Sequence, residues 1–150
     1  MIRLEVIELA EPMSSALEDF KRYAAVSDNT QEQLLLSALR TAMDKVQRVA
    51  DSALLAGRWR VCADDHLGVV SVYMGGKVVS VTDGEGLPVA FKQRGGRVYL
   101  GSDDYVEVEF VTEPVPADYA RLLPVVCQYA TALYDGQDER TLNRILNQCL

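Results

Sequence analysis

The sequence of 150 residues contains little of what disulfide, metal or membrane structures require. Its three cysteines, Cys62, Cys127 and Cys149, are widely separated and form no CxxC pair, which argues against a disulfide framework or a recognisable zinc site. Its single histidine, His66, would have to serve any Ser-His-Asp or Cys-His catalysis. No apolar run approaches the roughly 18 residues that cross a bilayer, and the N-terminus lacks the continuous apolar segment of a signal peptide. We expect reduced thiols in a protein that stays where it is made.

Basic residues are in the minority, with 15 Lys and Arg against 22 Asp and Glu, and the net charge is −7. Binding to phosphates depends on clustered cations that release counterions, so this balance argues against a nucleic-acid-binding role. The composition, with 49% hydrophobic and 25% charged residues, is typical of a folded globular protein. A chain of this length suits one domain, which we assign to residues 1–150.

The longest helical pattern lies within residues 30–56. At 100° per residue, one broad face is apolar and carries Leu35, Leu39, Ala42, Val46, Val49, Ala50 and Ala53. The opposite face is polar and carries Arg40, Asp44, Gln47, Arg48 and Asp51. Thr30 begins a capping box, and Gly57 stands where a left-handed residue would end the helix. The width of the apolar face predicts a core helix that other elements surround.

Shorter helices are predicted on both sides of it. Ser15 and Glu18 make a second capping box for a helix over residues 13–25, which the short link 27–29 joins to the long helix as a hairpin. Asp118 can cap a third helix over residues 118–135, in which Pro124 predicts a kink or a late start. A fourth helix over residues 138–149 has one apolar stripe, made of Leu142, Ile145, Leu146 and Leu150.

Strand patterns occupy the middle of the chain, and Ile2, Leu4 and Val6 alternate with charged residues as in a half-buried N-terminal strand. Six further strands are predicted over residues 59–62, 69–74, 77–82, 88–92, 97–100 and 105–112. The Gly-Gly pairs at 75–76 and 95–96 suit two-residue hairpin turns with positive φ at both positions. The predicted fold class is α+β: a mainly α-helical core, made of a helical hairpin plus the C-terminal helices, with an inserted antiparallel β-hairpin region over residues 58–112.

Only one segment gathers histidine, cysteine and carboxylates, namely Asp64-Asp65-His66 shortly after Cys62. A metal or acid/base site needs such side chains to converge, whereas consecutive residues in a turn usually point apart, and no second histidine completes a ligand set. We interpret the segment as a solvated turn. A metal-dependent enzyme that uses Cys62, Asp64 and His66 is kept as an alternative.

Two other motifs are interpreted as structural. The glycines at 75–76 and 84–86 fit neither Gly-x-x-x-x-Gly-Lys-Ser/Thr nor Gly-x-Gly-x-x-Gly before a helix, so we assign them to turns and not to phosphate loops. Glu107 and Glu109 could mimic a catalytic carboxylate pair, but they share one face of a strand whose other face is apolar. Surface charge on an exposed sheet face accounts for both carboxylates.

Lys92, Arg94 and Arg97 flank a hairpin tip, with Phe91 and Tyr99 close by in the sequence. They are interpreted as protection of a sheet edge, and contact with an acidic partner or with nucleic acid is the alternative. The sequence thus supplies no catalytic, cofactor-binding or metal-ligating residue that we can assign, which favours a binding or assembly role over catalysis.

Two stretches carry a resemblance to a known family. The first is Ala16-Leu17-Glu18-Asp19-Phe20-Lys21-Arg22-Tyr23, then Asp28-Asn29-Thr30-Gln31-Glu32-Gln33-Leu34-Leu35 and the long helix. It resembles the opening of tailed-bacteriophage head-tail connector (adaptor) proteins, which typically show a short helix, a polar acidic turn and a long amphipathic helix. The second is Val115-Pro116-Ala117-Asp118, which leads into residues 125–135. It resembles the family's valine-proline entry after the last strand and its apolar helix that closes on a leucine-tyrosine pair.

The resemblance implies a structural virion protein that assembles as a ring, commonly dodecameric, beneath the portal. DNA would pass through the channel without sequence-specific binding, tail-completion or stopper proteins would bind the far side, and the C-terminal helical end would engage the portal. The implied location is the head-tail interface of the virion, after assembly in the host bacterial cytoplasm. No enzyme activity, cofactor or metal is implied.

Candidate contact surfaces for such a ring are the apolar stripe of Leu142, Ile145 and Leu146 and the hairpins around Gly75 and Gly95. A further alternative to the connector is a non-viral protein-binding module, in which a peptide adds a strand at an exposed edge over residues 77–82.

Overall fold

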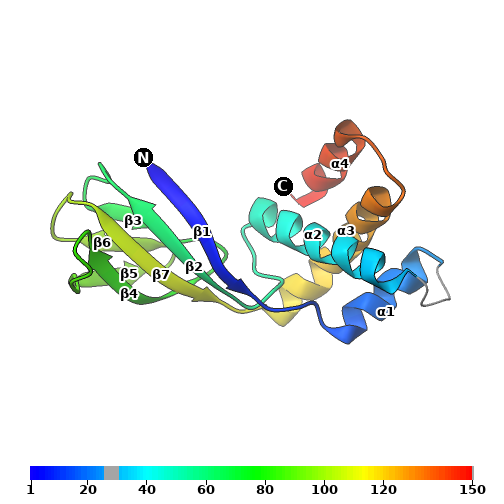
Figure 1. The fold of residues 1–150 in the computed structure, drawn as a ribbon, viewed down its shortest axis with the longest axis horizontal. Coiled ribbons are helices and arrows are strands. Elements are labelled where there is room, and N and C mark those ends of the chain that lie inside the picture. Colours follow the sequence, from blue (N-terminus) through cyan, green and yellow to red (C-terminus); the bar gives the residue numbers. More distant parts are fainter. Residues whose placement is uncertain (26–30, 150) are drawn as a thin grey trace. The chain divides into compact units, whose positions relative to one another are not determined.

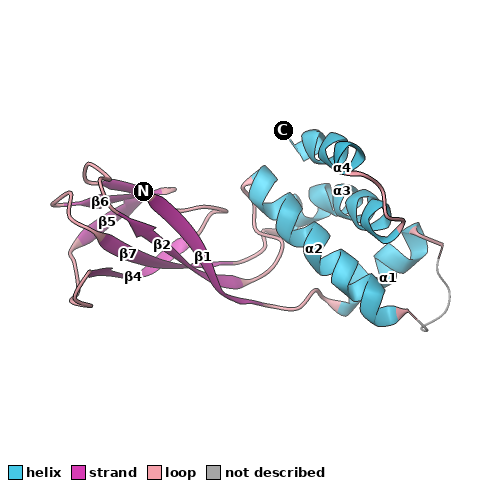
Figure 2. Cartoon of the chain, turned by 45° about the horizontal axis from the view of Figure 1, so that its top comes forward, coloured by secondary structure: helices cyan, strands magenta, loops and turns pink. Residues whose placement is uncertain are grey.

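The computed structural model describes residues 1–25 and 31–149, and the chain divides into two compact units that are each built from two segments. The sheet unit contains Met1–Ala10 and Ala56–Glu113, and the helical unit contains Glu11–Leu55 and Pro114–Leu150. Figure 2 shows that the strands belong to the former and the helices to the latter. The predicted fold class is therefore wrong in its balance. Seven strands in two antiparallel sheets form a complete unit of their own within the described residues, and are not a hairpin region inserted into a mainly helical core.

The sheet unit contains a larger and a smaller sheet (Figure 1). The larger has the order β1 (Ile2–Leu9), β2 (Gly57–Ala63), β7 (Val106–Thr112) and β4 (Lys77–Asp83). The smaller has the order β3 (Val69–Ser71), β6 (Arg97–Leu100) and β5 (Phe91–Arg94). Strand β1 pairs with β2 along its whole length, although two helices separate them in the sequence. The N-terminal strand is confirmed and is longer than predicted, and the sheet is not confined to residues 58–112.

The centre of the sheet unit is the pairing of β2 with β7. Trp59 lies directly opposite Phe110 in this ladder, and their stacked rings have centroids 6.4 Å apart. The indole N–H of Trp59 donates to Oγ1 of Thr112 at 3.1 Å, which satisfies the only polar atom of a fully buried side chain. This pair anchors the core of the unit because aromatic side chains bury more apolar area than any others.

Two glycines make room for these rings. A Cβ atom at Gly57 would lie 2.7 Å from Nε1 of Trp59, and a Cβ atom at Gly76 would lie 2.3 Å from Cδ2 of Phe110. Gly57 is the first residue of β2, so the prediction that it ends the preceding helix is wrong. Glycine is needed at this position because the Trp59 ring packs against it, and not because the backbone is left-handed.

The two Gly-Gly pairs have different roles. Residues 95–96 connect β5 to β6 as the predicted two-residue hairpin, with Arg94 opposite Arg97, although only Gly95 has a positive φ. Residues 75–76 connect strands of different sheets, so the hairpin predicted there is wrong. A tight turn is present all the same, because the N–H of Gly76 donates to the carbonyl of Tyr73 at 2.9 Å.

The helical unit contains α1 (Ser14–Tyr23), α2 (Glu32–Ala50), α3 (Pro116–Tyr134) and α4 (Glu139–Leu146), followed by a 3-10 turn over Asn147–Cys149. The predicted apolar face of the long helix is largely buried, and the core of the unit includes Phe20, Leu35, Leu39, Met43, Val46, Leu122 and Val126. No described helix is both long and apolar enough to span a bilayer. The Thr30 capping box and the link at 27–29 lie outside the described residues.

Helix α2 ends at Ala50, six residues earlier than predicted, with Asp51 in the left-handed conformation at φ 51°. Gln47, which was assigned to the polar face, is completely buried. Its Oε1 accepts hydrogen bonds from the backbone N–H groups of Leu54 and Leu55 at 3.1 and 3.2 Å, and its Nε2 donates to Asp44 at 3.1 Å. The Gln47 side chain thus takes the place of the backbone carbonyls that would accept from these two N–H groups in a helix. The backbone can therefore leave the helix while the side chains of Leu54 and Leu55 stay buried.

The predicted helix starts are only partly correct. Helix α1 begins after Met13, which lends no side-chain cap, so the box predicted at Ser15 does not form. Helix α3 begins at Pro116, a residue suited to the first turn because it lacks an N–H. Asp118 consequently lies inside the helix, where it accepts a hydrogen bond from Ser52 Oγ at 3.0 Å. Pro124 lies within α3 and on its exposed side, so α3 neither ends nor starts late there.

Replacing Gln47 with Ala should lower the free energy of unfolding by about 2–4 kcal/mol, because two buried backbone N–H groups lose their acceptor and a cavity remains. Urea unfolding followed by circular dichroism measures this change. Gln33→Ala on the exposed side of the same helix is the matched control and should change it little. Equal effects of the two substitutions would contradict the structural role of Gln47.

Replacing Gly76 with Ala should destabilise the protein by about 1–3 kcal/mol, because the added methyl group overlaps the buried ring of Phe110. Gly101→Ala adds the same methyl group where no atom lies within 4 Å and is the control. Thermal unfolding of both variants tests the difference. A Gly76→Ala protein as stable as the Gly101→Ala protein would mean that Phe110 is free to move aside.

Candidate interaction surfaces

The segment around His66 is a structural turn whose histidine is buried, and the prediction that it is solvated is correct only for the two aspartates. Nδ1 of His66 accepts a hydrogen bond from the N–H of Gly68 at 3.0 Å, and Nε2 lies 2.5 Å from the carbonyl oxygen of Asp104. Since Nδ1 is the acceptor, the ring proton sits on Nε2 and is donated to Asp104. Both nitrogens are therefore occupied, and the ring joins two turns of the sheet unit.

The other members of the candidate metal site have separate partners. Asp64 forms an ion pair with the N-terminal ammonium of Met1, which lowers the pKa of the carboxyl group, while Asp65 is exposed. Cys62 is buried in β2. No group of three His, Cys, Asp or Glu side chains within residues 1–25 and 31–149 is arranged to hold a metal ion. The geometry lends the metal-dependent alternative no support.

Two further groups, the Cys127 thiol and the Tyr105 hydroxyl, have raised pKa values. Burial raises the pKa of the Cys127 thiol, which is part of the core of the helical unit. The neighbouring Cys62 thiol makes the largest contribution to raising the pKa of Tyr105, and the Glu107 carboxylate makes the next largest. The Tyr105 hydroxyl donates a hydrogen bond to Glu107 at 3.0 Å. A thiol whose pKa is raised is a poor nucleophile near neutral pH, so Cys127 is suited to packing.

The carboxylates of β7 have the surface role that was predicted. Glu109 forms an ion pair with Arg58 on the neighbouring strand at 3.1 Å, while Glu107 accepts from Tyr105. Val108 between them is fully buried, as the alternation requires. The two carboxylates therefore have separate structural partners on one sheet face.

The backbone amides of the glycine-containing turn over residues 84–86 are hydrogen-bonded by the side chain of the preceding residue, Asp83. Oδ1 of Asp83 accepts from the backbone N–H groups of Glu85 and Leu87, each at 2.9 Å. These amides would have to face outward to hold a phosphate, and a carboxylate already occupies them. The structure agrees with the interpretation of these glycines as turn residues.

The edge predicted to accept a peptide is partly covered by the chain itself. Gln93 accepts from the N–H of Val78, and Val89 donates to the carbonyl of Val81 on the same strand, β4. Strand β1, at the other edge of the larger sheet, pairs only with β2 among the described residues and exposes Ile2, Val6 and Ile7. Addition of a strand at residues 77–82 is therefore less favourable than the sequence suggested.

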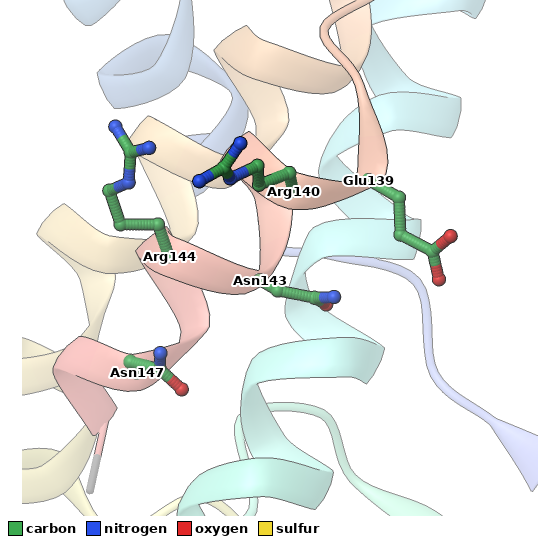
Figure 3. A pocket seen from close by; sticks show the side chains of 5 residues that line it. All are labelled: Glu139, Arg140, Asn143, Arg144 and Asn147. Atoms are coloured by element: carbon green, nitrogen blue, oxygen red, sulfur yellow. The ribbon is translucent and has the colours of Figure 1, made fainter.

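Helix α4 has a polar outer surface and a half-buried apolar stripe. Leu142, Ile145 and Leu146 are each partly covered within the helical unit, and Leu150 lies outside the described residues. The outer surface is a shallow depression of about 610 Å³ lined by Glu139, Arg140, Asn143, Arg144 and Asn147. Figure 3 shows Arg140 and Arg144 on one side of the helix, with Glu139 directed away from them. An extended, open surface of this kind suits contact with a macromolecule better than enclosure of a small ligand.

A second polar surface lies on the smaller sheet, and we call it the cation face: Lys92, Arg94, Arg97 and Tyr99. Lys92 is opposite Tyr99 and Arg94 is opposite Arg97 in the β5–β6 ladder, so the four side chains share one face. All four are exposed, and a depression of about 290 Å³ lies between Lys92, Arg94 and Tyr99. The sequence indicated these residues through their position at a hairpin tip, but not that they share one face.

The described residues thus form a unit with two antiparallel sheets and a unit with four helices. Each unit carries an open polar surface, on α4 and on the cation face.

No family model and no curated protein sequence matches the chain. Solved structures do match it. A chain of the neck of an empty gene transfer agent particle with C6 symmetry is 16% identical, with a TM-score of 0.65 over 98% of this chain and 94% of that one. A chain of the virion of a native gene transfer agent particle is 18% identical, with a TM-score of 0.61 over 97% and 93%.

A third match is a neck chain of the native particle with C12 symmetry, 19% identical, with a TM-score of 0.57 over 95% of this chain and 94% of that chain. At these identities the likeness is one of fold. The resemblance to phage head-tail connector proteins is therefore confirmed as a resemblance of fold to the neck chains of a phage-like particle.

Replacing His66 with Ala should lower the free energy of unfolding by about 1–3 kcal/mol, because Gly68 and Asp104 lose a buried hydrogen-bond partner. Urea unfolding measures this, and Asp103→Ala in the exposed neighbouring turn is the control. Added Zn²⁺ should leave the Tm of the wild-type protein unchanged. A Zn²⁺-dependent rise in Tm that disappears in His66→Ala would instead support the metal-dependent alternative.

Proposed function

We propose that this protein is a structural subunit of the neck of a tailed-phage-like particle, where copies form a ring between portal and tail and DNA passes through the channel. The observation that supports this most is the extent of the likeness to a neck chain, which covers 98% of this chain. Both compact units take part in a match of that extent. We accordingly treat residues 1–150 as one connector-like module.

The charge of the chain suits this position. Each copy carries a net charge of −7, so a ring of copies repels the phosphate backbone overall. Like charge removes the counterion-release affinity that would otherwise hold DNA in place. DNA passes through such a channel without sequence-specific binding.

The polar surface of α4 is the proposed contact with the portal protein, and tail-completion or stopper proteins bind the opposite side of the ring. Arg140 and Arg144 project from α4 without a carboxylate within 4.0 Å in the described part of the chain, so both are available to acidic groups of a partner. The role is assembly and not catalysis, since Cys62, Asp64 and His66 are each committed to structural contacts.

The purified protein should form rings of uniform symmetry, either alone at high concentration or on addition of the portal protein from the same particle. Negative-stain microscopy and size-exclusion chromatography with light scattering measure this. Rings are expected because, in the proposed assembly, each contact joins two different faces of the subunit. A series of such contacts forms a ring when the rotation between neighbouring copies closes.

A protein that stays monomeric at every concentration, with and without the portal, would overturn the proposal. Mass spectrometry of intact particles provides an independent check, in which the chain should be present in a fixed ratio to the portal protein.

A further inference from the structure

The cation face is unusual in an acidic chain because its charges have no partners. Among residues 1–25 and 31–149, the nine ion pairs include none that involves Lys92, Arg94 or Arg97. Arg94 and Arg97 even lie directly opposite each other, an arrangement of like charges that destabilises an antiparallel pair. An anionic group bound between them would remove that repulsion.

The cation face is held rigidly from behind. Gln93, which points to the other side of the sheet, accepts from the N–H of Val78 at 2.9 Å and donates to the carbonyls of Gly76 and Gly95 at 2.8 and 3.0 Å. Val98, opposite Gln93, is fully buried. The hairpin is therefore fixed to the rest of the sheet unit, so binding orders little additional backbone.

The cation face lacks any carboxylate, so it cannot bind the same face of a second copy. A two-fold contact would place cations against cations. Its partner must be a different surface that is acidic. If the partner is another copy of this chain, the contact is head-to-tail, and head-to-tail contacts produce rings or filaments.

The sheet unit contains such an acidic surface, which we call the carboxylate end: Asp65, Glu85, Asp103 and Asp104. Three observations place these turns together. Ala63 and Asp83 both pair with Val106, the first residue of β7. The ring of His66 contacts the carbonyl of Asp104. A Cβ atom at Gly84 would lie 3.5 Å from the Tyr105 ring.

The strand register places the carboxylate end and the hairpin tip of the cation face at opposite ends of the smaller sheet. Leu100 donates to the carbonyl of Gly68 beside the acidic turns, whereas Val72 donates to the carbonyl of Gly96 at the hairpin tip. The length of β6 separates the two ends, on the order of 10 Å at about 3.3 Å per residue. Arg94 and Arg97 are therefore set apart from the carboxylate end, whereas Lys92, opposite Tyr99, lies nearer to it.

We propose that the cation face of one copy binds the carboxylate end of the next copy, and that this contact links subunits around the ring. The inference rests on the proposed function and names the surfaces that would make the ring. Charge complementarity supports a second copy as the partner, because copies with a charge of −7 repel one another unless opposite charges meet at their interface. Tyr99 supplies an aromatic surface next to the cations, as interface centres commonly do.

The test uses charge reversal in the full chain. The head variant carries Arg94→Glu and Arg97→Glu, and the tail variant carries Asp65→Lys and Asp103→Lys. Each variant alone brings like charges together at every contact, so the protein concentration at which half of the rings form should rise about tenfold or more. An equimolar mixture should restore assembly, because alternating copies pair opposite charges at every interface. A chain with all four substitutions should also assemble.

A control variant with Arg22→Glu and Lys45→Glu changes the net charge by the same amount as the head variant, at exposed positions of the helical unit. It should assemble like the wild type. Thermal unfolding of every variant shows whether it is folded. If the head variant does not fold, Arg94→Gln with Arg97→Gln removes the charges without reversing them and should weaken assembly in the same direction.

The outcomes separate this inference from the proposed function. Wild-type protein that never forms rings would overturn the proposed function and this interface with it. Wild-type rings with unchanged assembly of both variants, or variants that the mixture does not rescue, would overturn the interface alone. Variants that assemble normally but lose retention of a short DNA duplex at low salt would assign the cation face to nucleic acid and overturn contact between copies.

Discussion

The sheet unit depends on one constraint, namely that β2 pairs with two strands that are distant in the sequence. Strand β1 precedes two helices and β7 follows four further strands, yet both form full ladders with β2. Closing such long loops costs conformational entropy before any contact forms. The burial of Trp59 against Phe110, with Thr112 as the hydrogen-bond acceptor, supplies the free energy that compensates. Gly57 and Gly76 are needed at their positions because these rings are there.

The helical unit follows the same principle with different chemistry. Its α2 and α3 come from segments on either side of β2–β7, and their apolar faces form a common core. At the end of α2 the buried amide of Gln47 takes over the hydrogen bonds of the helix, which lets Leu54 and Leu55 stay buried in a loop. Neither unit is complete until both of its segments have been synthesised.

The charges on the surface are organised although the composition is unremarkable. A net charge of −7 describes the chain as a whole, but Arg94 on β5 and Arg97 on β6 are set apart from the acidic turns at the other end of the smaller sheet. Arrangement of this kind directs association between acidic molecules, because it lets opposite charges meet only in one orientation. It is consistent with a fold shared with neck chains of symmetric particles.

Local features were predictable from the sequence because they depend on near neighbours. The 3.6-residue period of residues 32–50, the alternation of Val106, Val108 and Phe110, and the Gly95-Gly96 turn are written in intervals of two to four residues. The extent of the sheet, the burial of Gln47 and His66, and the true role of Gly57 were not predictable in this way. Each depends on atoms contributed by distant segments.

The sequence by itself therefore determined which segments become helices and strands, and it carried the resemblance to connector proteins. Only the tertiary structure decided that β1 joins β2, that β3 and β4 belong to different sheets, and that Arg94 and Arg97 lie at the opposite end of one sheet from the acidic turns. The physical reason is that periodicity reports which face of an element is apolar, whereas the choice of partner is made by burial and backbone pairing summed over the whole chain.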